Sequence, residues 1–347
     1  MAMQRLGLDV GTKNIVLSYR KDNKVNFIRE INGFYKMPVE NQYAKSMLKQ
    51  LGIPFIASED GKHLIALGEQ AEKIAVTFGG YLRRPMERGT LSVSEKEAMN
   101  IMAVIIRSIV GDLKEDAVLY YCIPADAINA KTNSAFHAKI VQAILDGYVS
   151  SSGNKLKAFP INEARALVFS QIPDKTGIGV SFGAGMINIS YCLFGMPVYE
   201  FSIVGSGDWI DAESARATGN LDMVEGVERP KALVTAAKES IDLRNGIPND
   251  PLLRAIYFHY QLLIEKVTNG IIKGFLENQN KAKAPMAMPI IVAGGTSSPP
   301  GFVDMFRDSF KKQEMPFQVG EIKAASNPLY AVSEGCLIVS ELHEEQA

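Results

Sequence analysis

The sequence is poor in cysteine and histidine and has no excess of either charge. The three cysteines, Cys122, Cys192 and Cys336, lie far apart in apolar segments and form no CxxC pair. This pattern excludes a disulfide framework and a cysteine zinc site, and it predicts reduced, buried thiols in a cytoplasmic protein. The four histidines show no metal-ligand spacing, so we expect no histidine metal centre.

Long apolar runs and basic patches are also missing. The 37 Lys and Arg residues balance 38 Asp and Glu residues and are scattered, which predicts no nucleic-acid partner. No run approaches the roughly 20 apolar residues of a membrane helix, so we expect no direct membrane insertion. The segment FGGYLRR, residues 78–84, is either a partly buried connection or an apolar loop with basic anchors.

One hairpin pattern occurs twice in the chain. Residues 180–191, VSFGAGMINISY, match residues 8–19, LDVGTKNIVLSY. The aligned pairs are Gly11 with Gly183, Ser18 with Ser190, Tyr19 with Tyr191, and Asp9 with Ser181. Each copy is typical of two strands joined by a glycine-bearing turn, and glycine turns leave amides free to bind phosphate. Either hairpin alone is better explained as part of an ordinary α/β core, whereas the pair predicts two turns facing one polyphosphate.

The order of elements around each hairpin is similar. Strands alternate with helices after each meander, which predicts two α/β domains around a cleft in a chain of 347 residues. We expect a helix over 94–110, where Ser94 and Glu97 have capping-box spacing, and a helical insertion in the second half that includes a long helix over 252–280.

Six fragments, in this order, carry a resemblance to a known superfamily: LDVGTKN, IALGEQA, RRPMERG, VSFGAGMIN, GDWIDAE and IIVAGGTSSPPGF. Together they resemble the actin, Hsp70 and sugar kinase superfamily, and most of all a divergent bacterial actin-like protein of the MreB type. The resemblance implies an α/β, actin-like (ribonuclease H-like) fold with duplicated domains, mixed five-stranded sheets around a nucleotide cleft, and a small inserted subdomain in each half.

The resemblance also implies domain limits. The first domain covers residues 1–155, with an insertion at about 34–82. The second covers 156–327, with an insertion at about 210–284. A C-terminal helix, 328–347, returns to the first domain.

Both hairpin turns match the phosphate loops of this superfamily. The resemblance places Asp9 beside Mg²⁺, through water. The residues implied at the phosphates are Gly11, Thr12, Lys13 and Asn14 on one side and Gly183, Ala184 and Gly185 on the other. Without the resemblance, Lys13 is equally well a solvated turn residue.

Other implied site residues come from the second half. Glu163 matches the glutamate that positions the attacking water, although by itself it is a first-turn helix carboxylate. Gly207 and Asp208 match a further turn near the nucleotide, and Asp208 is equally well a helix N-cap. The residues implied at adenosine are Gly294, Gly295 and Thr296 together with Lys238 and Glu239, and the last two are alternatively exposed helix charges.

Two positions depart from the family pattern. Ser181 stands where the second phosphate loop carries aspartate, and Met186 stands where it carries threonine. A hydroxyl binds a metal-coordinated water more weakly than a carboxylate, so we expect ATP or GTP with Mg²⁺ to bind and hydrolysis to be slow.

Three functions are compatible with this pattern. The first is a filament-forming, weakly ATP-hydrolysing cytoskeletal protein that associates with itself. The others are a non-polymerising nucleotide-binding scaffold and a small-molecule kinase, which would need a catalytic aspartate where Ser181 stands.

Overall fold

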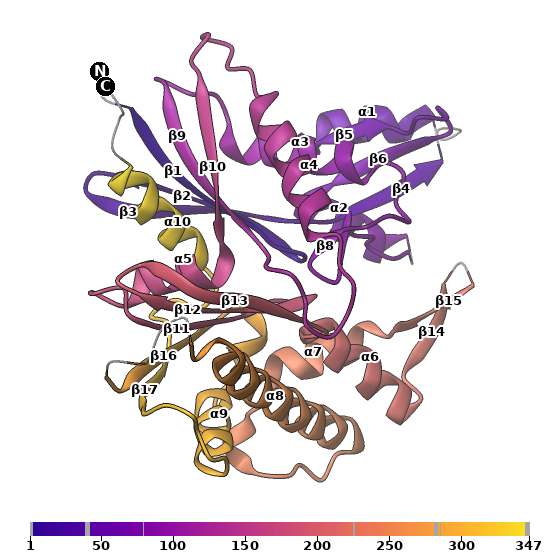
Figure 1. Ribbon diagram of the computed structural model, residues 1–347. Coiled ribbons are helices and arrows are strands. Elements are labelled where there is room, and N and C mark those ends of the chain that lie inside the picture. The colour runs from indigo at the N-terminus through magenta and orange to yellow at the C-terminus, as the bar shows by residue number, and fades with distance from the viewer. Residues whose placement is uncertain are drawn as a thin grey trace.

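The computed structural model describes residues 3–343 except 39–41, 79, 225, 281–283 and 285. It contains two mixed five-stranded sheets that lie one above the other, with helices on both (Figure 1). The α/β fold predicted from the sequence is confirmed.

The first sheet has the order β10-β9-β1-β2-β3. Its strands are β1 (Gln4–Val10), β2 (Asn14–Lys21), β3 (Lys24–Ile31), β9 (Ala117–Ile123) and β10 (Leu156–Asn162). The β1-β2-β3 meander is antiparallel, while β9 and β10 run parallel to β1. Helices α3 (Ala98–Val110) and α4 (Ser134–Asp146) belong to this half.

The second sheet repeats this topology in the order β13-β12-β11-β16-β17. Its strands are β11 (Gly177–Phe182), β12 (Met186–Leu193), β13 (Met196–Val204), β16 (Met288–Ala293) and β17 (Val319–Ala324). The long helix α8 (Pro251–Asn278) and helix α9 (Phe302–Lys311) pack on it. In the core between them, the Phe182 ring makes edge-to-face contacts with Phe302 and Phe306.

Two helices lie between the sheets. Helix α5 (Glu163–Gln171) follows β10 and contacts β11, and helix α10 (Ala331–Leu342) contacts both α5 and β1. Glycine permits this close approach, because a Cβ at Gly335 would lie 1.8 Å from the Ala166 carbonyl oxygen and one at Gly7 would lie 2.2 Å from the Leu337 nitrogen. The two glycines therefore allow α10 to pack closely against α5 and β1.

Smaller elements extend each half. The first insertion contains β4 (Phe34–Pro38), α1 (Gln42–Gln50), β5 (Phe55–Ala57), β6 (His63–Leu67) and α2 (Gly68–Thr77), followed by the hairpin β7 (Met86–Glu87) and β8 (Thr90–Leu91). The second half carries α6 (Gly207–Thr218), β14 (Leu221–Val224), β15 (Val227–Pro230) and α7 (Ala232–Ser240).

Two local predictions were wrong. Helix α3 begins at Ala98, and its N-cap, Glu97, makes no capping hydrogen bond. The Glu97 carboxylate instead accepts the Glu59 amide and lies 3.2 Å from the Lys36 ammonium, so a tertiary contact replaces the capping box. The second insertion is also not all helical, because β14 and β15 form a hairpin within it.

The predicted domain limits stay a prediction, and the last four residues of the 328–347 segment lie outside the described residues. Strand β10 lies beyond the predicted limit at 155, yet it is hydrogen-bonded in the first sheet. The three cysteines are buried and unpaired, as predicted. Within the described ranges, no helix combines the length and apolar character that crossing a membrane requires.

Candidate functional site

A cavity of about 360 Å³ lies between the two sheets, and both hairpin turns line it. The predicted residues that line it are Asp9, Gly11, Thr12, Lys13, Asn14, Glu163, Gly183, Ala184, Gly185, Asp208, Lys238, Glu239, Gly294, Gly295 and Thr296. Gly207 lies directly behind the lining, where a Cβ would be 2.5 Å from the Thr296 hydroxyl oxygen. The fold thus brings together residues that are up to 287 positions apart, from Asp9 to Thr296.

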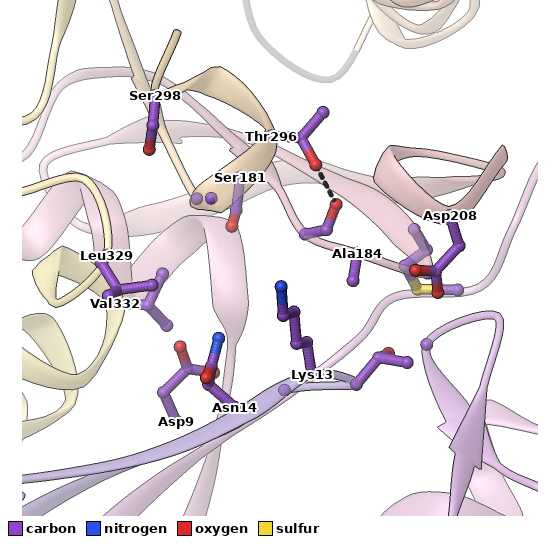
Figure 2. Close-up of a pocket in the computed structure, with 18 of the residues that line it drawn as sticks. Asp9, Lys13, Asn14, Ser181, Ala184, Asp208, Thr296, Ser298, Leu329 and Val332 are labelled. Atoms are coloured by element: carbon purple, nitrogen blue, oxygen red, sulfur yellow. Dashed lines mark hydrogen bonds between the residues drawn. The ribbon is translucent and has the colours of Figure 1, made fainter. Parts of the chain in front are cut away.

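The two turns face each other across the cavity. In Figure 2, Asp9, Lys13 and Asn14 rise from the first hairpin, opposite Ser181 and Ala184, and the Lys13 side chain extends between them. No backbone hydrogen bond in the described residues is donated by the amides of Thr12, Lys13, Ala184 or Gly185. Two sets of free amides around one cavity fit a polyphosphate, which such turns bind through backbone N–H groups.

Two partly buried carboxylates, those of Asp9 and Glu163, line the cavity. Asp9 accepts a hydrogen bond of 3.0 Å from the Cys122 thiol, and burial raises the pKa of Asp9 to about 6. Burial and the nearby Asp9 charge raise the pKa of Glu163 to about 8. A cation placed beside them would favour the ionised forms, so this donor set fits Mg²⁺ held through water.

Glu163 is held by two donors from the second sheet. The Ser181 hydroxyl donates to Oε1 at 2.5 Å and the Asn188 amide nitrogen donates to Oε2 at 2.7 Å. Glu163 itself begins α5 directly after Asn162, whose side chain caps that helix. The Glu163 carboxylate therefore has a fixed orientation among the residues that line the cavity.

Ion pairs cross the cavity mouth. Lys13 Nζ lies 2.5 Å from Glu239 Oε1, and Arg84 Nη1 lies 2.9 Å from Asp208 Oδ1. Asp208 is therefore not a helix N-cap, since Ser206 occupies that position and the Asp208 carboxylate faces Arg84. Cations of the first half of the chain, Lys13 and Arg84, thus pair with carboxylates of α6 and α7 in the second half.

Lys238 is buried rather than an exposed helix charge. Its ammonium donates to Asp211 at 2.7 Å and to the Gly207 carbonyl at 2.9 Å. Glu239, next to it, is the exposed member of the predicted pair. Lys238 thus fixes the turn at Gly207 against the wall of the cavity.

The loop after β16 closes the far side. Gly294 has φ +94°, and a Cβ there would lie 2.3 Å from the Phe182 carbonyl oxygen. A Cβ at Gly295 would meet nothing within 4 Å, although Gly295 lines the cavity. The Thr296 hydroxyl donates to the Gly183 carbonyl at 2.7 Å (Figure 2), which joins this loop to the second turn. The open surface at Gly295 fits a flat ring lying against backbone.

The sequence analysis missed several residues of this site. Arg84 lies in the fragment RRPMERG, which carried the resemblance, but nothing in the sequence pairs it with Asp208. Asn188 occupies the second hairpin and was read only as part of an alternating strand. Asn188 does not line the cavity itself, and further missed residues that do line it include Cys122, Asp211, Thr235, Tyr260, Ser298, Leu329 and Val332.

Comparisons with known proteins place the fold. A protein family described as Volactin matches residues 3–340. None of the curated proteins matches the chain. A solved MamK double helical filament is similar at 17% identity and a TM-score of 0.67, over 98% of this chain and 99% of that one.

Two further solved structures are similar at 17% identity. Ta0583, an archaeal actin homologue, has a TM-score of 0.60 over 98% of this chain and 100% of its own. A non-polymerising MamK mutant bound to AMPPNP has a TM-score of 0.54 over 98% and 99%. At this identity the likeness concerns the fold, and it confirms the predicted actin-like fold.

Proposed function

The chain belongs to the Volactin family, and we propose that it is an actin-like cytoskeletal protein that binds ATP or GTP with Mg²⁺ between its domains and assembles into filaments. The observation that carries this proposal is the pair of glycine turns with free amides facing one cavity. The MamK structure bound to AMPPNP supports it, because that fold accommodates a nucleoside triphosphate analogue.

Each part of the cavity has a proposed role. Thr12, Lys13, Ala184 and Gly185 bind phosphate oxygens, and the Gly294–Gly295 surface carries the purine and ribose. Asp9 holds Mg²⁺ through water, and the bound ion supplies charge neutralisation at the phosphates. Glu163 orients a water molecule toward the terminal phosphate.

We propose that hydrolysis is slow. The position that would carry a second carboxylate holds Ser181, whose hydroxyl is already donated to Glu163. Fewer carboxylates at the metal mean less stabilisation of the transition state, which arises mainly from positioning and electrostatics. A small-molecule kinase is disfavoured for the same reason, because Ser181 offers no base for a substrate hydroxyl.

Self-association is the further part of the proposal. The MamK chain with this fold forms a double helical filament. A heterologous contact that does not close into a ring propagates into such a filament. We place the protein in the cytoplasm, where its three thiols stay reduced.

Electron microscopy and sedimentation of the purified protein with ATP and Mg²⁺, and with neither, test this function. We expect filaments and a pelleted fraction that depend on nucleotide. Nucleotide binding with monomers at every protein and salt concentration would favour the non-polymerising scaffold instead.

A further inference from the structure

Asn188 lies between Glu163 and the first domain. It is fully buried in β12 and is the cross-strand partner of Ser181 in β11, so both side chains approach Glu163 from one face of the sheet. Its amide nitrogen donates to Glu163 Oε2 at 2.7 Å, and its amide oxygen accepts the Ala125 backbone N–H at 3.2 Å. One side chain thus joins the carboxylate to a loop that follows β9 of the first sheet.

That loop, residues 124–129, is seated on the second sheet. The Ser202 hydroxyl donates to the Ala125 carbonyl at 2.8 Å, and the Ile128 amide donates to the Ser202 carbonyl at 2.9 Å. Ala127 forms a parallel bridge with Ser202 of β13, the edge strand. The loop is therefore a docked connection between the halves, and Asn188 contacts its first turn.

The orientation of the Asn188 amide is fixed by its partners. If the amide were rotated by half a turn, its NH₂ group would face the Ala125 N–H and its oxygen would face the carboxylate. The contact with the Ala125 N–H would then be repulsive, and the contact with Glu163 would be repulsive whenever Glu163 is ionised. An aspartate cannot donate to Glu163 and an apolar residue can satisfy neither partner, so the position calls for one donor and one acceptor.

We propose that Asn188 is a positioning residue that couples the orientation of the Glu163 carboxylate to the seating of the 124–129 loop. The water-orienting arrangement of the site is then complete only when the first domain is docked on the second sheet. The predicted effect on hydrolysis rests on the proposed function. The coupling between Glu163 and the loop rests on the hydrogen bonds alone.

Hydrogen exchange tests the coupling without nucleotide and without changing Asn188. In Glu163→Ala, the Asn188 amide loses its acceptor, and we expect exchange of the Ala125 amide to accelerate about fivefold. The Ile128 amide lies in the same loop and is hydrogen-bonded to Ser202 of β13. It serves as the internal control and should keep its exchange rate. An unchanged Ala125 rate, or equal acceleration at both amides, would overturn the coupling.

Phosphate release and nucleotide affinity, measured separately, test the positioning. Asn188→Asp keeps the acceptor for Ala125 and removes the donor to Glu163, so we expect release to fall at least tenfold while the nucleotide Kd changes less than threefold. Asn188→Ala is the second variant. It should show the same loss of phosphate release and also faster exchange of the Ala125 amide, because alanine removes the acceptor of that amide. In a Glu163→Gln background, Asn188→Asp should cause no further loss, because its effect runs through that carboxylate.

The outcomes separate this inference from the proposed function. A tenfold loss that persists in the Glu163→Gln background, or an equal loss of affinity and rate, would show a structural role and refute positioning. A wild-type protein that binds ATP and releases no phosphate would refute hydrolysis and the positioning role with it. The exchange result would still decide whether Glu163 and the loop are coupled.

Discussion

The metal-free protein should lose stability as the pH rises from about 5 to 8, because Glu163 is protonated when folded. Burial and Asp9 raise its pKa from 4.5 to about 8. At pH values between 4.5 and 8, folded Glu163 holds a proton that the unfolded chain has released. The free energy of unfolding therefore decreases as the pH rises. At roughly 1.4 kcal/mol per pH unit for one proton, Glu163 contributes a loss of at most about 5 kcal/mol between pH 4.5 and 8. Asp9, whose pKa burial raises to about 6, adds to the loss at the acidic end of this range.

Urea unfolding of the nucleotide-free protein between pH 5.5 and 8.5, at constant ionic strength, measures this effect. Glu163→Gln cannot ionise, so its stability should depend less on pH than that of the wild type in this range. Glu277→Gln, which removes an exposed carboxylate from α8, is the matched control and should keep the wild-type dependence. A wild type whose stability rises with pH, or a Glu163→Gln variant with the same slope, would refute a protonated Glu163.

Three further predictions follow from individual contacts. Ser181→Asp would place a second carboxylate beside Glu163, since the Ser181 hydroxyl oxygen now lies 2.5 Å from Glu163 Oε1. Without metal at pH 8, the free energy of unfolding should fall by about 3–5 kcal/mol, as for an uncompensated buried charge. Mg²⁺ with ATP should restore more stability than in the wild type, and equal melting temperatures of the two proteins in EDTA would contradict this. Gly335→Ala should lower the free energy of unfolding by about 2–4 kcal/mol, because its Cβ would lie 1.8 Å from the Ala166 carbonyl oxygen. A chemical denaturation curve that matches that of the wild type would disprove this close contact. Lys13→Ala should weaken ATP binding about tenfold through loss of one phosphate contact. The free energy of unfolding should change little, because the ion pair of Lys13 with Glu239 is exposed. Unaltered ATP affinity in calorimetry would show that Lys13 is a solvated turn residue.

The sequence predicted most strands because their signals are local. Gly11 and Gly183 mark the hairpin turns, and alternating apolar residues mark the strands on either side. The start of α3 was misplaced because Glu97 binds Lys36 and the Glu59 amide, a tertiary contact that overrides capping-box spacing.

The cavity residues were found by resemblance, while their partners were not. Asp208 lies 124 positions from Arg84, and no local pattern reports such a pair. Likewise, Ser181 was interpreted only as a missing carboxylate, whereas the structure also makes it a donor to Glu163. Contacts of this kind depend on how two sheets approach each other, which a single sequence does not encode locally.

Nucleotide binding in the cavity is the central claim. Thermal unfolding with increasing ATP and Mg²⁺ tests it most directly, and we would compare the wild type with the Gly295→Ala and Gly295→Trp variants. At about 100 times the Kd, binding should stabilise the wild type by about 2.7 kcal/mol. The Cβ at residue 295 meets nothing within 4 Å, so the alanine variant should fold as the wild type does. We expect the tryptophan variant to fold as well, because residue 295 lines a cavity of about 360 Å³. The alanine variant should still respond to ATP, whereas the tryptophan variant should not, because its ring fills the space proposed for the purine. A wild type that does not respond to ATP, or a Gly295→Trp variant that responds as the wild type does, would contradict a nucleotide site between these two sheets.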